Sequence, residues 1–302
     1  MLQPLKAGNK IAIVALARKV NLIDIQWAIQ TFDNWGLQVV LGETITATYN
    51  IFAGTDAERA ADLQTMLDNP EIKAVISARG GYGTTRMLDL VDFSRFKENP
   101  KWVIGFSDIT ALLCHIQTLE IESIHAIMPA LFSKIGTEDA IESLRRVLFG
   151  EPVFYPLIAP HPLNRNGLGT GQLVGGNVSL LVTIIGTSSD VDYTGKILFI
   201  EEVEEYLYSL DRMLVQLKRA GKLALLTGLV VGHMTDMQDN PVPFGRTAYE
   251  IIADHTQAYA FPICYGFPTG HEPHNLALVC GREVQLSVTA AGAILAYTYD
   301  GI

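Results

Sequence analysis

The sequence predicts an α/β protein of two domains: a doubly wound, mostly parallel sheet first, then a mixed β/α domain with fewer helices. Apolar runs typical of buried strands alternate with amphipathic helical stretches through the first half. The length of 302 residues exceeds one ordinary core. Prolines and weak periodicity then mark a connection. We therefore expect domains at 1–150 and 169–302, joined by a linker at 151–168.

The elements of the first domain follow in order along the chain. Predicted strands, bounded by turn residues, cover 10–15, 37–41, 74–78 and 103–106. Predicted helices cover 21–35, 55–67 and 138–148. The second of these begins with a capping box of Thr55 and Glu58. Because sites in parallel sheets lie at the carboxyl ends of strands, we look for function after the third and fourth strands.

The second domain opens with the glycine-rich run 169–177, which places Asn177 on a predicted turn. Strands are expected at 196–201 and 226–231, and short strands continue to the C-terminus. Apolar residues at helical spacing predict helices near 207–217 and 245–255. This pattern is typical of a mixed sheet.

Composition excludes several classes of function. A net charge of −10 and a pI near 5.1 argue against nucleic-acid and anionic-membrane partners. No run of 18 apolar residues is present to span a bilayer. The apolar stretch 11–17 imitates a short signal peptide but reads as a buried first strand, which favours a cytoplasmic protein. The three cysteines lack C-x-x-C spacing and are expected to be reduced core residues.

Ser107 stands where an apolar strand gives way abruptly to a helical pattern. A serine at such a turn presents its Oγ, and the helix N-terminus behind it supplies backbone N–H groups. This is the arrangement of a nucleophile elbow. The local pattern, Gly105-x-Ser107-x-Ile109, lacks the second glycine of the usual motif. Alternatively, Ser107 caps the helix that follows.

A glycine cluster, Arg79-Gly80-Gly81-Tyr82-Gly83, follows the third strand. Its backbone N–H groups are suited to an oxyanion hole or an anion nest. Alternatively, it is a tight turn before a helix. The spacing fits neither a dinucleotide fingerprint nor a phosphate-binding P-loop.

Glu201 and His271 are the candidate acid and base. Glu201 directly follows four apolar residues of a strand, so we expect it to be held in a cleft, whereas Glu202 faces the other side. His271 lies on a stiff loop of glycines and prolines, a position suited to general base catalysis. His271 and His274 form an H-x-x-H pair, but no third ligand is signalled nearby, so we predict no metal.

Ser107, Glu201 and His271 together compose a possible catalytic triad. His271 would take the Ser107 proton, and Glu201 would hold the imidazole and stabilise its charged form. The backbone N–H groups of Gly81 and Asp108 would form the oxyanion hole. Since the serine and its partners fall in different domains, the active site is expected in the interdomain cleft.

Eight stretches, in order through nearly the whole chain, match a known family. They are Leu5–Val14, Phe52–Asp56, Ala78–Gly83, Gly105–Thr110, Gly175–Asn177, Gly195–Glu202, Asp211–Leu214 and Gly266–His271. In these the chain resembles the LD-carboxypeptidase family of serine peptidases, which includes muramoyltetrapeptide carboxypeptidases and microcin C self-immunity peptidases.

The resemblance implies the same triad, Ser107, Glu201 and His271, with no metal or other cofactor. It also implies a homodimer that cleaves an L-to-D peptide bond and releases terminal D-alanine from cytoplasmic muropeptides during peptidoglycan recycling. Three stretches depart from the family pattern: 15–19, 187–190 and 278–281. The first borders the expected cleft and leaves substrate detail open, whereas the other two concern packing.

Recognition of a terminal carboxylate calls for a cation or clustered backbone donors. The candidates are Arg79 with the backbone around Gly80 and Tyr82, or alternatively Arg18. Asn177 either binds the peptide through its amide or is a turn residue tolerant of positive φ. Two rival functions stay open: a self-immunity peptidase acting on nucleotide conjugates, and a non-catalytic muropeptide-binding protein.

Overall fold

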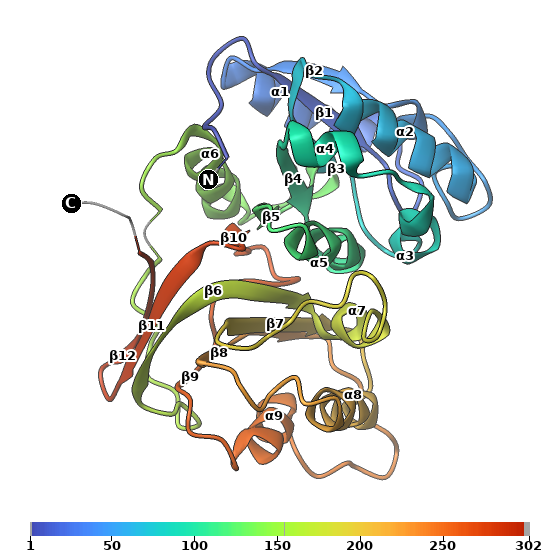
Figure 1. Ribbon diagram of the computed structural model, residues 1–302. Helices are drawn as coiled ribbons and strands as arrows, with labels where there is room; N and C mark the ends of the chain where they lie inside the picture. The colour runs from blue at the N-terminus through green and yellow to red at the C-terminus, as the bar shows by residue number, and fades with distance from the viewer. Residues whose placement is uncertain (1, 154, 299–302) are drawn as a thin grey trace. The chain divides into compact units, whose positions relative to one another are not determined.

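A computed structural model describes residues 2–153 and 155–298 (Figure 1). The chain divides into two compact units, Met1–Val153 with Pro273–Val279, and Phe154–Glu272 with Cys280–Ile302. Each unit contains one six-stranded sheet and its own helices.

The first sheet has the strand order β10-β5-β4-β3-β1-β2. Its strands are β1 (Lys10–Val14), β2 (Gln38–Leu41), β3 (Ile72–Ser77), β4 (Trp102–Gly105), β5 (Ser123–His125) and β10 (Leu278–Cys280). From β2 to β5 every neighbouring pair is parallel, as predicted. The strand β10, contributed by the C-terminal part of the chain, completes this sheet, and its residues are fully buried.

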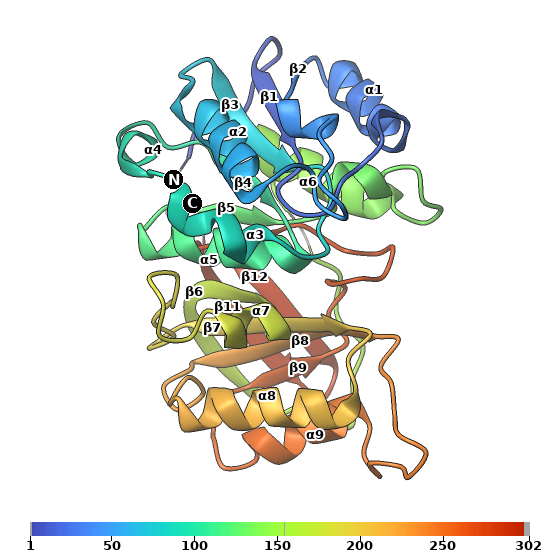
Figure 2. The same ribbon diagram turned by 90° about the vertical axis from the view of Figure 1, so that its right-hand side faces the viewer.

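Helices cover both faces of the first sheet, which confirms the doubly wound arrangement (Figure 2). On one face α1 packs against η5 and the end of α6, through contacts of Phe32 with Phe132 and of Trp35 with Phe149. On the other face α2 contacts α3 and α4, and α3 contacts α5. The α-helices are α1 (Gln26–Asn34), α2 (Asp56–Asp68), α3 (Thr84–Met87), α4 (Ser94–Glu98), α5 (Thr110–Thr118) and α6 (Glu138–Phe149). The short 3-10 helices are η1 (Leu22–Ile25), η2 (Glu43–Ile45), η3 (Leu88–Leu90), η4 (Ser107–Ile109) and η5 (Pro129–Leu131).

The starts of α2 and α1 can be compared with their predictions. The capping box at the start of α2 is confirmed, since Thr55 Oγ1 accepts from the Glu58 N–H and the Glu58 carboxylate accepts from the Thr55 N–H. The helix predicted at 21–35 begins as the 3-10 turn η1 before α1.

The second sheet is mixed, as predicted, with the order β12-β11-β6-β7-β8-β9. Its strands are β6 (Gly167–Asn177), β7 (Ile197–Val203), β8 (Gly228–Thr235), β9 (Ile263–Tyr265), β11 (Glu283–Thr289) and β12 (Gly292–Tyr297). The four strands β6 to β9 are parallel, whereas β11 is antiparallel to both β6 and β12. The helices α7 (Val178–Thr183), α8 (Leu207–Arg219) and α9 (Ala248–Thr256) contact one another in order along the parallel part (Figure 1).

The prediction that Asn177 lies on a glycine-rich turn is wrong, because residues 169–177 belong to the long strand β6. Its glycines are required by neighbouring backbone. A Cβ on Gly169, Gly171 or Gly175 would lie about 2 Å from a carbonyl oxygen, at 2.0, 2.3 and 1.9 Å respectively. Asn177, the last residue of β6, has φ −67°, so it is not a positive-φ turn residue.

Other predictions on the core are confirmed. Cys114, Cys264 and Cys280 lie buried as thiols, and burial raises the pKa of Cys264 to about 12. Among the described residues, no helix is long and apolar enough to cross a membrane.

Gly175 and Gly186 offer a matched test of this packing. Both have positive φ, 142° and 80°, but a Cβ on Gly186 meets nothing within 4 Å. We expect Gly186→Ala to cost about 1 kcal/mol from backbone strain, and Gly175→Ala to cost about 3 kcal/mol or more because β6 must move from β7. Urea unfolding followed by circular dichroism measures both. Equal destabilisation by the two substitutions would contradict the packing explanation.

Candidate active site

Ser107 lies directly beyond the carboxyl end of β4, as the first residue of η4, and is half-buried. Its φ is 61°, a left-handed conformation that costs a non-glycine residue about 1–2 kcal/mol. The N-cap of η4 is Phe106, not Ser107, so the simple helix-cap explanation does not describe this serine. Strained backbone at the end of a central strand is a feature of nucleophile elbows and points to function.

Two glycines leave room for this turn. A Cβ on Gly105 would lie 2.7 Å from Ile109 Cγ2, so the residue before the turn must be small. A Cβ on Gly80 would lie 3.3 Å from Ser107 Oγ, which places the backbone of the glycine cluster beside the hydroxyl. The first unit therefore brings the predicted serine and the predicted cluster together.

Of the remaining residues of the cluster, Gly81 and Tyr82 are exposed and Arg79 is half-buried, whereas Gly83 is buried. Gly81 has φ 118° and faces the stem of the Arg18 side chain. Tyr82 is exposed, with its ring 5.9 Å from that of Phe52. Arg79 is half-buried, and its Nη1 lies 3.4 Å from the Lys19 carbonyl oxygen. Arg18, Arg79 and the cluster thus belong to one edge of the first sheet.

In the second unit Glu201 and His271 form a close pair. His271 Nδ1 lies 2.7 Å from Glu201 Oε2, with the Glu201 side chain fully buried and that of His271 18% exposed. With Glu201 as a carboxylate acceptor, Nδ1 carries the proton, and the other ring nitrogen, Nε2, is the one suited to act as a base. The predicted acid and base are therefore adjacent.

The loop that carries His271 is held against β8 by backbone hydrogen bonds. Phe267 donates its N–H to the Val231 carbonyl, and the Thr269 carbonyl accepts from the His233 N–H at 2.9 Å. Gly270, with φ 125°, lets the loop approach Glu201, because a Cβ there would lie 3.0 Å from Glu201 Cβ. The imidazole is thus placed by backbone contacts as well as by its carboxylate partner.

The surroundings of His271 raise its pKa above the ordinary value of 6.5. Burial on its own lowers the pKa, but the negative charge and hydrogen bond of Glu201 and the charges of Glu202 and Glu204 together outweigh it. A base with a raised pKa is a stronger proton acceptor but is neutral only at higher pH.

Glu202 points away from His271, as predicted, and supports the end of β7. Burial and the neighbouring Glu201 raise its pKa. Its carboxylate accepts from Asn177 Nδ2 at 2.6 Å and from the Ser179 N–H and hydroxyl at 2.8 and 2.9 Å. Asn177 Oδ1 also caps α7 by accepting from the Leu180 N–H. The Asn177 amide therefore ties the ends of β6 and β7, while binding of substrate by this amide stays a prediction.

The second histidine of the H-x-x-H pair takes a different partner. His274, in the first unit, has Nε2 3.7 Å from Asp139 Oδ2. Within the described residues, no group of three or more His, Cys, Asp or Glu side chains is arranged to hold a metal. His255 Nε2 lies 2.8 Å from Asp211 Oδ1 and so ties α9 to α8, which is a structural role.

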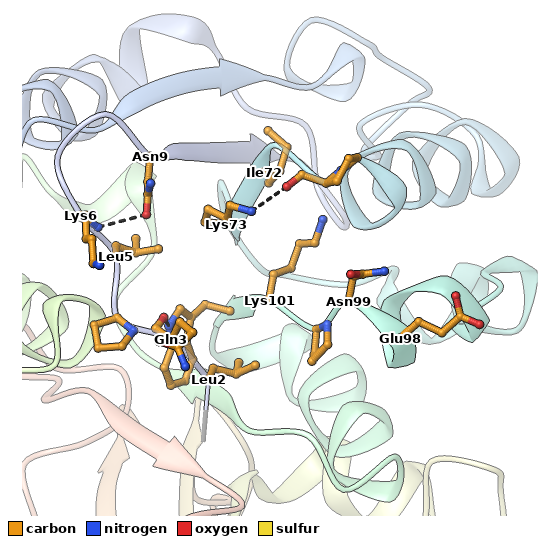
Figure 3. A pocket seen from close by; sticks show the side chains of 14 residues that line it. Leu2, Gln3, Leu5, Lys6, Asn9, Ile72, Lys73, Glu98, Asn99 and Lys101 are labelled. Carbon is orange, nitrogen blue, oxygen red and sulfur yellow. Dashed lines mark hydrogen bonds between the residues drawn. The ribbon is translucent and has the colours of Figure 1, made fainter.

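A cavity of about 580 Å³ lies at the opposite edge of the first sheet, near the start of β1, β3 and β4 (Figure 3). Two lysines that line the cavity bind backbone carbonyl groups. Lys101 Nζ donates to the carbonyls of Met66 and Asn69, and Lys73 Nζ donates to that of Pro70. These bonds satisfy carbonyl groups at the end of α2. Lys73 and Lys101 therefore have a structural explanation, and Ser107 is not among the residues that line the cavity.

Sequence reasoning missed two residues that shape the edge carrying Ser107. Thr84 starts α3 and hydrogen bonds to the Asp108 carboxylate, and Arg59 is fully buried against the glycine cluster. A threonine directly after a glycine run, and an arginine beside apolar positions of a helix, are the signals that point to them. Each unit thus carries one part of the predicted triad, and the relation of Ser107 to His271 stays a prediction.

Comparisons with known proteins match two successive parts of the chain. Residues 11–126 match the family model of the LD-carboxypeptidase N-terminal domain, and residues 170–286 match that of the C-terminal domain. A probable murein peptide carboxypeptidase of Bacillus subtilis is 34% identical, over 96% of this chain and 92% of that protein. The microcin C7 self-immunity protein MccF of Escherichia coli is 26% identical, over 83% of this chain and 81% of that protein.

The solved structures show the same fold. The crystal structure of muramoyltetrapeptide carboxypeptidase from Oxalobacter formigenes aligns with a TM-score of 0.85 and 26% identity. That alignment covers 97% of this chain and 100% of the other. The two family models together match most of the sequence, and the matched residues include Ser107, Glu201 and His271. The chain therefore belongs to the LD-carboxypeptidase family and is a serine-type carboxypeptidase.

Proposed function

We propose that this protein hydrolyses an L-to-D peptide bond and releases the terminal D-alanine of muropeptide tetrapeptides through Ser107, Glu201 and His271. The hydrogen bond between His271 and the fully buried Glu201 carries the proposal, because it orients the imidazole to act as a base. The strained turn at Ser107 supports a nucleophilic role for that serine. The printed names of the murein-peptide relatives support the substrate class.

The proposed reaction has two steps. His271 Nε2 accepts the Ser107 hydroxyl proton as Oγ attacks the carbonyl carbon, and the backbone N–H groups of Gly81 and Asp108 stabilise the oxyanion. Collapse of this intermediate breaks the C–N bond, and His271 gives the proton to the departing D-alanine amine. Water then attacks the acyl carbon with His271 as base, and the ester bond to Ser107 Oγ breaks. The shortened peptide leaves with a new carboxylate, and His271 returns the proton to Ser107.

Several finer points of the proposal stay predictions from the sequence. They are a homodimer, recycling of peptidoglycan in the cytoplasm, and a site in a cleft between the domains. The proposed steps use side chains and backbone alone, so activity is expected to survive treatment with a metal chelator.

Replacing the proposed nucleophile tests the reaction directly. We expect Ser107→Ala to lower kcat for D-alanine release from L-Ala-γ-D-Glu-diamino acid-D-Ala by roughly 10⁴-fold or more. Ser133→Ala, at an exposed serine of the same unit, is the control and should match the unmodified protein. Release of D-alanine by the Ser107 variant at the normal rate would refute the mechanism. No release by the unmodified protein would refute the substrate.

Glu201 should control the pH dependence of the base. Because the folded pKa of His271 is raised, kcat/KM should fall as the pH drops through a value above 6.5. Glu201→Gln removes the neighbouring charge, so the acidic limb should move to lower pH while the plateau falls by about 10³–10⁴-fold. Initial rates between pH 5 and pH 9 measure both effects. An acidic limb that stays in place in the variant would show that His271 is not the group titrated.

The substrate carboxylate provides a test that separates Arg79 from Arg18. If Arg79 binds it, Arg79→Met should raise KM for the tetrapeptide by about 10–100-fold. The same variant should lose the preference for the free acid over the C-terminal amide, while Arg18→Met keeps it. The reverse result assigns the carboxylate to Arg18. Unchanged preference in both variants would leave recognition to the backbone donors of the glycine cluster and refute a role for either cation.

A second candidate function is cleavage of a peptidyl or aminoacyl nucleotide conjugate. The likeness to the microcin C7 self-immunity protein supports it, as do two exposed aromatic residues, Tyr49 and Tyr82, that belong to the same edge as the glycine cluster. Aromatic faces are suited to stacking a base. The kcat/KM for a glutamyl-sulfamoyl nucleotide, measured beside that for the tetrapeptide, decides between the two substrates.

The sequence alone also leaves open a non-catalytic muropeptide-binding protein, and membership of a serine-type carboxypeptidase family argues against it. Such a protein would bind the tetrapeptide in isothermal titration calorimetry without releasing D-alanine. The unmodified protein and Ser107→Ala would then behave alike in both assays.

A further inference from the structure

The side chain of Asp108 joins the Ser107 turn to the glycine cluster. Its Oδ2 accepts from the Thr84 N–H at 2.9 Å and from the Thr84 hydroxyl at 2.6 Å. Asp108 is 2% exposed and Thr84 fully buried, so water does not compete for these bonds. The residue after the serine is thereby bonded to the residue after the cluster.

Arg59 holds the other side of the same segment. Its Nη1 donates to the Gly83 carbonyl at 2.8 Å and to the Leu16 carbonyl at 2.6 Å, and Nη2 pairs with Asp56. Gly83 has φ 141°, and a Cβ there would lie 2.7 Å from Arg59 Nη1, so a larger residue would displace the guanidinium. The guanidinium also interacts favourably with the charge of Asp108, so that this buried carboxylate is compensated within the unit.

The glycine-rich segment 80–83 needs these hydrogen bonds to stay in one conformation. The segment 80–83 contains three glycines, and glycine loses more backbone freedom on ordering than any other residue. An oxyanion hole works because its donors are already in place when charge develops. A segment with so little steric constraint of its own therefore needs bonds from outside to hold its N–H groups.

We propose that Arg59, Thr84 and the Asp108 carboxylate form a clamp that positions the oxyanion-stabilising backbone of Gly81 and Asp108. These three are positioning residues, and they act through the backbone donors. The inference rests on the proposed function, since it gives the clamp a role in that reaction.

The matched variants Thr84→Val and Thr84→Ser test the clamp. Valine keeps the shape of threonine but lacks the hydroxyl donor, whereas serine keeps the donor. We expect Thr84→Val to lower kcat for D-alanine release roughly tenfold with KM within about twofold, because the oxyanion forms only in the transition state. Thr84→Ser should stay within about twofold of the unmodified protein in both constants. Asp108→Asn should lower kcat by roughly 10- to 100-fold, because both bonds lose their charged acceptor.

Phosphonylation of Ser107 by a fluorophosphonate provides a second measurement, independent of the peptide. We expect the phosphonylation rates of the variants to follow the same order as their kcat values, because the phosphonyl oxygen occupies the oxyanion position. Wild-type kcat in Thr84→Val, an equal loss in Thr84→Ser, or losses that match the unfolded fraction seen by circular dichroism would overturn the clamp alone. Absence of both D-alanine release and phosphonylation in the unmodified protein would overturn the proposed function, and the clamp with it.

Discussion

A buried carboxylate needs a hydrogen-bond partner, and the second unit is arranged to give Glu201 one. Glu201 is 0% exposed, and burial of a lone charge costs several kcal/mol. Its Oε2 bonds to His271, while Oε1 has no hydrogen-bond partner among the described residues. The buried Glu201 carboxylate is therefore stabilised mainly by its hydrogen bond to the imidazole. The same bond holds His271 in one tautomer and one orientation. The close approach at Gly270 and the backbone bonds from β8 follow from this requirement.

The first unit meets a different constraint, which is backbone strain at Ser107. A left-handed serine persists where the surrounding structure leaves no better alternative. Gly105 leaves space for Ile109 behind the turn, and the two bonds of the Asp108 carboxylate fix the residue that follows. The strain is thus opposed by packing and by buried hydrogen bonds in the next residues. Both units place their polar groups at the carboxyl ends of parallel strands, where backbone N–H groups of the following helices also gather.

Much of the fold could be predicted because it depends on local patterns. The capping box at Thr55 and the alternation of strands and helices each depend on short stretches of sequence, and both predictions are confirmed. The strand β6 could not be predicted from composition. Its glycines are needed because neighbouring backbone lies too close for a Cβ, but in the sequence a run of glycines is typical of a turn. The short strand β10 and the bonds of Asp108 depend on partners far away in the chain, which no local pattern encodes. Local patterns and family motifs predict roles for Ser107, Glu201 and His271, but only the fold shows the contact between Glu201 and His271.

Differences in substrate among such proteins should lie in the loops rather than in these constrained residues. A change at Gly270, Gly83 or Asp108 disturbs buried contacts, so these positions have little freedom to vary. The loop after β1 is different, because Arg18 is exposed and the stretch 15–19 departs from the family pattern. It pairs through Arg18 with Phe52, next to the exposed Tyr49. Exposed side chains at the carboxyl edge can be exchanged at little loss of stability, since neither packing nor a buried hydrogen bond depends on them. The choice between a muropeptide and a nucleotide conjugate should therefore follow the side chains of this edge, while the proposed triad and its supports would serve either reaction.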